Sequence, residues 1–159
     1  MNRIARFEYV SEEQFSQAFE GKTPMVPPLP KRATAGSAGY DFYTPIPLHL
    51  APGETVKVPT GIRCRMENGW VLQLYPRSGL GFSYRLQLNN TVGIIDSDYY
   101  DSDNEGHIFI KITNDSNEGR VLSLPTGSAF AQGLFVPFGI TEDDAVTAIR
   151  NGGLGSTSK

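Results

Sequence analysis

A carboxylate follows an apolar run near the middle of the chain, in the segment 89–100, which reads NNTVGIIDSDYY. The pattern predicts strand, tight turn and strand, with Gly93 allowing a bulge or a close backbone approach and Asp96-Ser97-Asp98 forming the turn. Asp96 comes directly after two isoleucines, and a carboxylate at the rim of an apolar wall can act as a base that holds one water. We therefore expect a pocket here, with Asp96 as its base and Tyr99 as a flat wall.

Two other interpretations of this segment stay open at this point. The first is an exposed hairpin turn that happens to be acidic. The second is a calcium loop, because residues 101–106 resemble the start of an EF-hand loop. That loop requires Glu at its twelfth position, where this chain has Ile112, and the flanking residues alternate as strands do.

Anion chemistry is suggested by two further segments. In residues 76–81, PRSGLG, Arg77 offers a fork of donors, Ser78 a hydroxyl, and Gly79 lets backbone N–H groups converge on oxygens. The same residues could form an ordinary turn. The glycine-rich end of the chain, 150–159, contains Arg150 and three hydroxyl side chains, so it is either disordered or a strap that orders over an anion.

Single polar residues stand in two otherwise small or apolar segments. Asp41 follows the small residues of 33–39, where it could equally be a turn or cap residue. Gln132 lies within the apolar run 129–136 and needs a hydrogen-bond partner, which the backbone could supply.

The elements that must position these residues are mainly strands. A chain of 159 residues with 17 Gly and 11 Pro forms one domain of short strands and many turns. Turns at 51–53, 59–61 and 67–69 recur about every 8 to 10 residues, which indicates a sandwich, jelly roll or barrel. A strand within 3–10 should precede a short helix that begins with the capping-box pattern SEEQ at 11–14.

Composition narrows the class of protein further. The net charge is −3 and no run of Lys and Arg exceeds two residues, so no footprint for general nucleic-acid binding is present. Cys64 is the single cysteine, which excludes an internal disulfide and suits a core residue in a reducing compartment. We find neither a signal-peptide pattern nor 18 consecutive apolar residues, and we expect a cytoplasmic chain without a membrane segment.

Together, five segments in this order resemble the trimeric dUTP pyrophosphatase (dUTPase) family over about residues 29 to 159. They are AGYD at 38–41, PRSGL at 76–80, GIIDSDY at 93–99, residues 127–132, and GGLGST at 152–157. The resemblance implies an all-β, jelly-roll-like sandwich or barrel with one or two short helices, assembled as a homotrimer with sites shared between subunits. Residues 1–28 would be an N-terminal strand and helix extension of this single domain, 1–159, and residues 150–159 a flexible lid.

The resemblance also implies an activity, the magnesium-dependent hydrolysis of dUTP to dUMP and pyrophosphate. Asp96 would activate the water that attacks the α-phosphorus, and Tyr99 would pack under the deoxyribose and leave no room for a 2′-hydroxyl. The implied uracil contacts are Asn90, Gly93 and Ile95. The implied phosphate and lid contacts are Arg77, Ser78, Gly79, Gln132, Arg150, Leu154, Gly155 and Ser156. Asp41 would touch the waters of a Mg²⁺ ion that the triphosphate holds.

Three departures from the family pattern accompany the match. Ala129 stands where the fourth motif usually has Arg, and Leu154 replaces the usual Phe, which removes an aromatic ring from the lid. The acidic loop 100–106 replaces a glycine-containing continuation. Two rival functions therefore stay open: a dCTP deaminase relative with the same fold, and a regulatory protein that binds a protein partner through the loop.

Overall fold

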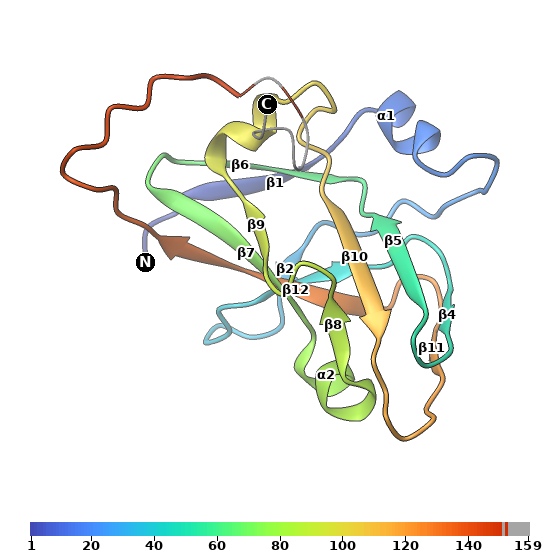
Figure 1. Ribbon diagram of the computed structural model, residues 1–159. Helices are drawn as coiled ribbons and strands as arrows, with labels where there is room; N and C mark the ends of the chain where they lie inside the picture. Colours follow the sequence, from blue (N-terminus) through green and yellow to red (C-terminus); the bar gives the residue numbers. More distant parts are fainter. Residues whose placement is uncertain (151, 153–159) are drawn as a thin grey trace.

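Short strands make up most of the computed structural model, which describes residues 1–150 and residue 152 (Figure 1). In chain order the elements are β1 (Ala5–Tyr9), α1 (Glu12–Gln17), β2 (Lys31–Arg32), β3 (Tyr40–Tyr43), β4 (Leu48–Leu50), β5 (Thr55–Pro59), β6 (Ile62–Met66), β7 (Trp70–Pro76), α2 (Ser78–Tyr84), β8 (Leu86–Leu88), β9 (Gly93–Ile95), the 3-10 helix η1 (Ser97–Asp101), β10 (Phe109–Asn114), β11 (Leu122–Leu124) and β12 (Ala129–Pro137). The predicted all-β fold with short helices is confirmed. No helix in the described part of the chain is long and apolar enough to cross a membrane.

Antiparallel pairing organises the strands into two main sheets. The larger sheet has the order β2-β3-β12-β7-β9, and the smaller has the order β5-β10-β8. The strands β8 and β9 are consecutive in the chain but pair with different neighbours, β8 with β10 and β9 with β7. The hairpin that they form therefore bridges the two sheets, and its arms diverge.

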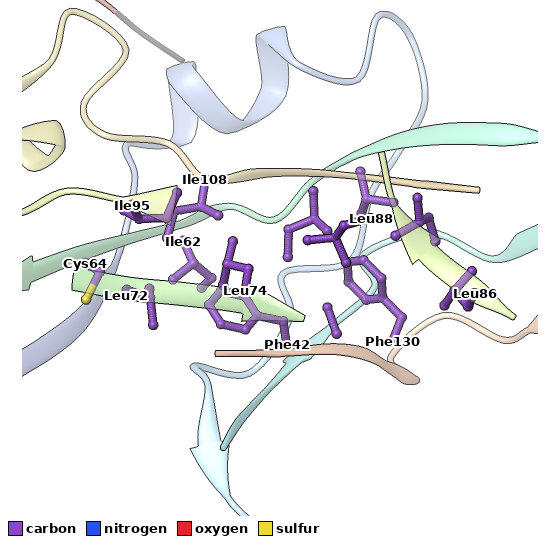
Figure 2. Packing of buried hydrophobic residues seen from close by; sticks show 14 of the residues in the cluster. Phe42, Ile62, Cys64, Leu72, Leu74, Leu86, Leu88, Ile95, Ile108 and Phe130 are labelled. Atoms are coloured by element: carbon purple, nitrogen blue, oxygen red, sulfur yellow. The ribbon is translucent and has the colours of Figure 1, made fainter. Parts of the chain in front are cut away.

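The hydrophobic core fills the space between these sheets (Figure 2). Phe42 and Phe130 of the larger sheet are 1% and 0% exposed, and Leu86 and Leu88 of β8 are 2% and 4% exposed. Strands that alternate in sequence bury alternate side chains, as a half-buried sheet requires. Cys64 lies in this core, and burial raises the pKa of its thiol to about 12, which confirms its predicted role as a core residue.

In the N-terminal extension, the helix α1 follows the strand β1; the start of the helix was predicted correctly, and one of its capping partners was not. The Ser11 Oγ accepts a hydrogen bond from the Gln14 N–H at 3.1 Å, as an N-cap should. A capping box would also return a bond from the Gln14 side chain to the Ser11 N–H. That N–H instead donates to the Glu105 carboxylate at 2.7 Å, so the helix start is tied to a distant loop.

Two local features differ from their sequence-based descriptions. The turn expected at 96–98 is the start of η1, and the hairpin turn lies earlier, between β8 and β9. The segment 76–81, which could have formed an ordinary turn, continues into α2, for which Arg77 is the N-cap residue. In both cases the backbone continues into a short helix, which turn-forming residues permit as readily as an open turn.

Candidate functional site

A cavity of about 310 Å³ opens where the arms of the β8–β9 hairpin diverge. Its lining residues are Lys57, Leu74, Leu88, Asn89, Asn90, Gly93, Ile94, Ile95, Phe109, Ile110 and Lys111. Most of these residues are apolar, and Asn89 and Asn90 of the hairpin turn contribute amide side chains. Three residues predicted to contact a base, Asn90, Gly93 and Ile95, therefore line one pocket.

Gly93 explains why the hairpin can approach β7 closely enough to form this pocket. A Cβ atom at position 93 would lie 2.9 Å from the Cβ of Leu74. Any larger residue would push β9 away from β7 and open the pocket, so the expected close backbone approach is confirmed.

Asp96 follows the last residue of β9 and stands at the start of η1, with its side chain 49% exposed. The Arg150 guanidinium donates to the Asp96 Oδ2 at 2.5 Å and to the Asp98 Oδ1 at 2.9 Å. Arg150 was predicted to contact a phosphate. In this structure it pairs with the carboxylates of its own chain, the only kind of anionic group that the chain itself offers to a guanidinium.

Tyr99 differs most from its sequence-based description. Its ring is 1% exposed, and its hydroxyl donates to the His107 carbonyl at 2.7 Å and accepts from the Asn104 side chain at 2.9 Å. Burial raises the pKa of this phenol. The Arg150 guanidinium lies 5.9 Å from the ring centroid. The open wall predicted at Tyr99 is therefore absent from this arrangement, because the ring packs into the core and Arg150 lies over it.

His107 is a buried polar residue that sequence reasoning missed. Its side chain is 0% exposed, and its Nε2 accepts a hydrogen bond from the Gly61 N–H at 2.9 Å. Burial lowers the pKa of this imidazole to about 4, although the neighbouring Glu105 opposes the shift. The ring is therefore neutral at pH 7. No spacing or motif marks this position, so the sequence held no signal for it.

The acidic loop 100–106 packs against the N-terminal extension. The Tyr100 hydroxyl donates to Glu8 of β1 at 2.6 Å, and the Arg63 guanidinium of β6 lies 3.6 Å from the Tyr100 ring centroid. Glu105 accepts from both the N–H and the hydroxyl of Ser11. These contacts tie the loop to the N-terminal extension. Within the described residues, no three of its carboxylates converge to hold a metal ion.

A second cluster of predicted residues gathers at the end of β7. The Arg77 Nε lies 3.2 Å from the Asp41 Oδ1. Gln132 pairs with Asp41 in the register of β12 and β3, and its side chain donates to the Pro76 carbonyl at 3.2 Å. The partner required for Gln132 is thus a backbone group, the alternative left open by the sequence. The first-turn N–H groups of Ser78 and Gly79 have no partner within α2 itself.

Asp96 and Arg77 lie at opposite ends of β7, as Figure 1 shows for η1 and α2. Ile95 is paired with Leu72, so Asp96 falls opposite Val71, and Arg77 follows six residues further along the strand direction. At about 3.3 Å per residue, this places the two residues roughly 20 Å apart. No single phosphate can contact both groups of one chain.

The remaining predictions concern the lid, position 129 and the metal ion. Leu154, Gly155 and Ser156, which were predicted as lid contacts, lie outside the described residues. Ala129, in place of the usual Arg, begins β12 beside a bulge in its pairing with β3. Within residues 1–150 and 152, no three His, Cys, Asp or Glu side chains converge to hold a metal ion.

Comparison with known proteins identifies relatives along most of the chain. A protein-family model described as dUTPase matches residues 27–158. A deoxyuridine 5′-triphosphate nucleotidohydrolase from Lactococcus lactis is 42% identical over 132 residues, which cover 81% of this chain and 87% of the relative. The crystal structure of a dUTPase from Streptococcus mutans matches with a TM-score of 0.66 and 36% identity, over 86% of this chain and 98% of that one.

One more distant structure matches in fold. It is a mutant dUTPase from phage phi11 of S. aureus, which is described with a coordinated structural Mg(II) ion. It has a TM-score of 0.66 and 21% identity, and the match covers 94% of this chain and all of that one. Both structures share the fold of this chain. The family match begins at residue 27, so most of the N-terminal extension lies outside it.

Proposed function

Because this chain belongs to the dUTPase family, we propose that it hydrolyses dUTP to dUMP and pyrophosphate. One observation carries the proposal for this chain in particular. The residues that line the pocket of the β8–β9 hairpin lead directly into Asp96, so a base held in the pocket brings the rest of a nucleotide toward that carboxylate.

The pocket suits a pyrimidine because its lining combines apolar side chains with hydrogen-bonding groups. Leu74 and Leu88 offer flat apolar surface. The Asn90 side chain and the backbone around Gly93 and Ile95 would read the polar edge of uracil. A base with the wrong pattern of donors and acceptors would leave one of these groups unpaired, which penalises its binding.

Asp96 is the proposed general base. Its carboxylate is half-exposed, so it can hold a water, and it would take a proton from that water as the oxygen attacks the α-phosphorus. Arg150 must leave Asp96 for this step, since its guanidinium now holds the carboxylate. The triphosphate is the natural competitor for Arg150, because it offers more negative charge than the two aspartates. Departure of Arg150 would also uncover Tyr99, against which the deoxyribose would pack.

Arg77, Ser78, Gly79 and Gln132 are the proposed phosphate contacts at the other end of β7. Mg²⁺ would be held by the triphosphate and would neutralise part of its charge. The chain fits this role for the ion, because the described residues offer no cage of three ligands and Asp41 is a single carboxylate beside Arg77. A lone carboxylate suits contact through the ion's waters, which magnesium releases reluctantly.

A homotrimer with shared sites is part of the proposal. The roughly 20 Å between Asp96 and Arg77 of one chain is too long for both to act on the same phosphorus. If the pocket end of one copy faces the Arg77 end of the next, both groups reach one nucleotide. Three copies related by a three-fold axis close this head-to-tail arrangement. The single buried Cys64 is consistent with action in the cytoplasm.

The experiment is a pyrophosphate-release assay of the purified chain with Mg²⁺ and, separately, dUTP, dCTP, dTTP and UTP. We expect rapid release from dUTP and at least a hundredfold slower release from the others. Ammonia release from dCTP would instead identify a deaminase. A chain that hydrolyses none of the four, while it is folded and trimeric, would contradict the proposed function.

A further inference from the structure

Tyr100 follows Tyr99 directly, and the site described above gives it no role. The residue is held at three points: its carbonyl, its ring and its hydroxyl. The Arg63 guanidinium of β6 donates from Nη2 to the Tyr100 carbonyl at 2.7 Å, and its Cζ lies 3.6 Å from the centroid of the ring. The Tyr100 hydroxyl donates to the Glu8 Oε2 at 2.6 Å. The neighbour of Tyr99 is therefore fixed to two strands, β1 and β6.

Strand pairing holds the two residues that bind Tyr100. Glu8 and Arg63 lie directly opposite each other in the antiparallel pair of β1 and β6. The same stretch of β6 is anchored in the core, where Ile62 and Cys64 are each 2% exposed. The hydrogen bond from Tyr100 lowers the pKa of the Glu8 carboxyl, so the acceptor is charged at pH 7 and the bond is of the stronger, charge-assisted kind. Glu8 and Arg63 together form a clamp on Tyr100.

Tyr99 depends on this clamp because its own hydrogen bonds stay within one segment, 99–107. Its hydroxyl binds the Asn104 side chain and the His107 carbonyl. These bonds place the ring within the segment and leave the position of the segment to its ties with other elements. Core packing also holds the ring, but hydrophobic contact is non-directional. The clamp on Tyr100 is the tie next to Tyr99, and the other ties of the segment lie further along the chain.

Asp96 is positioned by a different element. It directly follows Ile95, which pairs with Leu72 of β7, so the larger sheet sets its place. Tyr99 lies further along, within the short 3-10 helix η1, and the hydrogen bonds of such a helix have poorer geometry than those of an α-helix. A disturbance at Tyr100 should therefore displace Tyr99 more than Asp96.

We propose that Tyr100 is a positioning residue, which sets the position of the Tyr99 ring under the sugar and so contributes to the rejection of a 2′-hydroxyl. This inference rests on the proposed function, because it takes Tyr99 as the surface against which the deoxyribose packs. A misplacement of about 1 Å in a positioned group is enough to change a rate by up to about a hundredfold. Glu8 lies outside the family match, which begins at residue 27, so the N-terminal extension supplies part of the sugar selectivity.

The test compares Tyr100→Phe with Tyr9→Phe, each in the full chain. Tyr9 is the matched control, because it also lies on β1 and its hydroxyl donates to the Pro27 carbonyl at 3.0 Å rather than to a residue of the site. Both variants lose one hydrogen bond and should melt about a few degrees lower. For Tyr100→Phe, we expect KM for dUTP to rise roughly five- to tenfold and kcat to stay within about twofold. The dUTP-to-UTP ratio of kcat/KM should fall about tenfold, and Tyr9→Phe should leave all three values unchanged.

Variants of Glu8 test the same bond from its other side. Glu8→Ala removes the acceptor and should reproduce the kinetics of Tyr100→Phe. Glu8→Gln is the conservative variant, and it should keep most of the discrimination because its amide oxygen can accept from Tyr100. Both Glu8 variants lose the ion pair with Arg6, so the difference between them isolates the bond to Tyr100. The double variant Glu8→Ala with Tyr100→Phe should be no worse than either single variant, since both act through one bond.

An unchanged dUTP-to-UTP ratio in folded Tyr100→Phe and Glu8→Ala would overturn the inference. An equal fall in kcat for both substrates would overturn it too, because that result places the effect at the reacting water. Calorimetry with dUMP and UMP repeats the comparison without hydrolysis, and the ratio of the two affinities should fall in the same variants. A wild-type chain that binds dUMP and releases no pyrophosphate from dUTP would contradict the proposed function alone.

Discussion

The two ends of β7 are built in opposite ways. At the end next to Asp96, Tyr99 and His107 are buried. Polar groups of the segment from η1 to His107 bind partners in the N-terminal extension and the β5–β6 turn. At the other end, α2 has no buried residue, and Phe82 is 93% exposed. The first end is held by its own chain, whereas the second has apolar surface left over. This contrast supports the proposal that a second copy completes the site.

The two ends of β7 differ in structure because their proposed tasks differ. The end that positions a base and a reacting water must hold atoms to within a fraction of an ångström, and buried hydrogen bonds achieve this. The end that binds phosphates relies on charge, which tolerates a looser fit.

The largest effect should come from Asp96, at the end of β7 next to η1. Asp96→Asn keeps the shape of the side chain and removes the proposed base, so kcat should fall about a thousandfold. Binding of a non-hydrolysable imido analogue of dUTP, measured by calorimetry, should change little. The control is Asp98→Asn, two residues away and also paired with Arg150, which should lower kcat only a few-fold. Near-normal turnover in Asp96→Asn would remove Asp96 from the mechanism.

A mixing experiment tests the proposal that the two ends work together across chains. Asp96→Asn and Arg77→Ala should each be nearly inactive alone. If they are unfolded together and refolded in equal amounts, roughly a quarter of the sites should combine an intact Asp96 with an intact Arg77 from the neighbouring copy. Activity should therefore recover to about a quarter of wild type in a pyrophosphate-release assay.

The controls for mixing are each variant refolded alone and the mass of the refolded assembly. Recovery only after co-refolding supports a site built from two copies. If verified mixed trimers show no recovery, Asp96 and Arg77 of one chain must act on the same nucleotide. That outcome would contradict the argument from the separation of the two residues along β7.

The third prediction concerns the pH dependence of the unfolding free energy, to which His107 contributes. His107 has a folded pKa of about 4, below its value of about 6.5 in the unfolded chain. Between these values the unfolded state binds more protons, so stability is complete above about pH 6.5 and is lost as pH falls toward 4. The free energy of unfolding should fall by about 2 kcal/mol from pH 7 to pH 5 on account of this one group.

Urea unfolding at pH 7 and pH 5, at one protein concentration, measures this loss. His107→Gln provides the comparison, because a glutamine oxygen can accept from the Gly61 N–H and does not titrate. The pH-dependent loss should be smaller in the variant by the stated amount. Equal losses in both proteins would show that His107 is not the group responsible.

The smallest effect concerns the link between the extension and the loop. Ser11→Ala removes the cap of α1 and one of two hydrogen bonds to Glu105, which should cost about 1 kcal/mol of unfolding free energy. Ser16→Ala, an exposed change in the same helix, is the matched control and should be within about 0.5 kcal/mol of wild type. Both variants should keep normal kcat. A large fall in kcat in Ser11→Ala alone would mean that the extension positions Asp96 more directly than this prediction assumes.

Local sequence patterns determined the strands, the start of α1 and the order of the five motifs. The turns at 51–53 and 67–69, the Ser11 cap and the alternation in β6 and β10 depend on residues within a few positions of one another. Close approach at Gly93 was also predictable, because only glycine lacks the atom that would collide with Leu74.

Tertiary structure alone decided the environment of the site residues. Asn104 and His107 lie only a few positions beyond Tyr99, but the sequence does not show that they would bind its hydroxyl, or that the distant Arg150 would lie over its ring. Likewise, the Ser11 N–H finds its acceptor 94 positions away in Glu105. Burial and pKa depend on which distant segments pack together. The distance between Asp96 and Arg77 depends on strand register, which pairs β9 with one end of β7 and leaves Arg77 at the other.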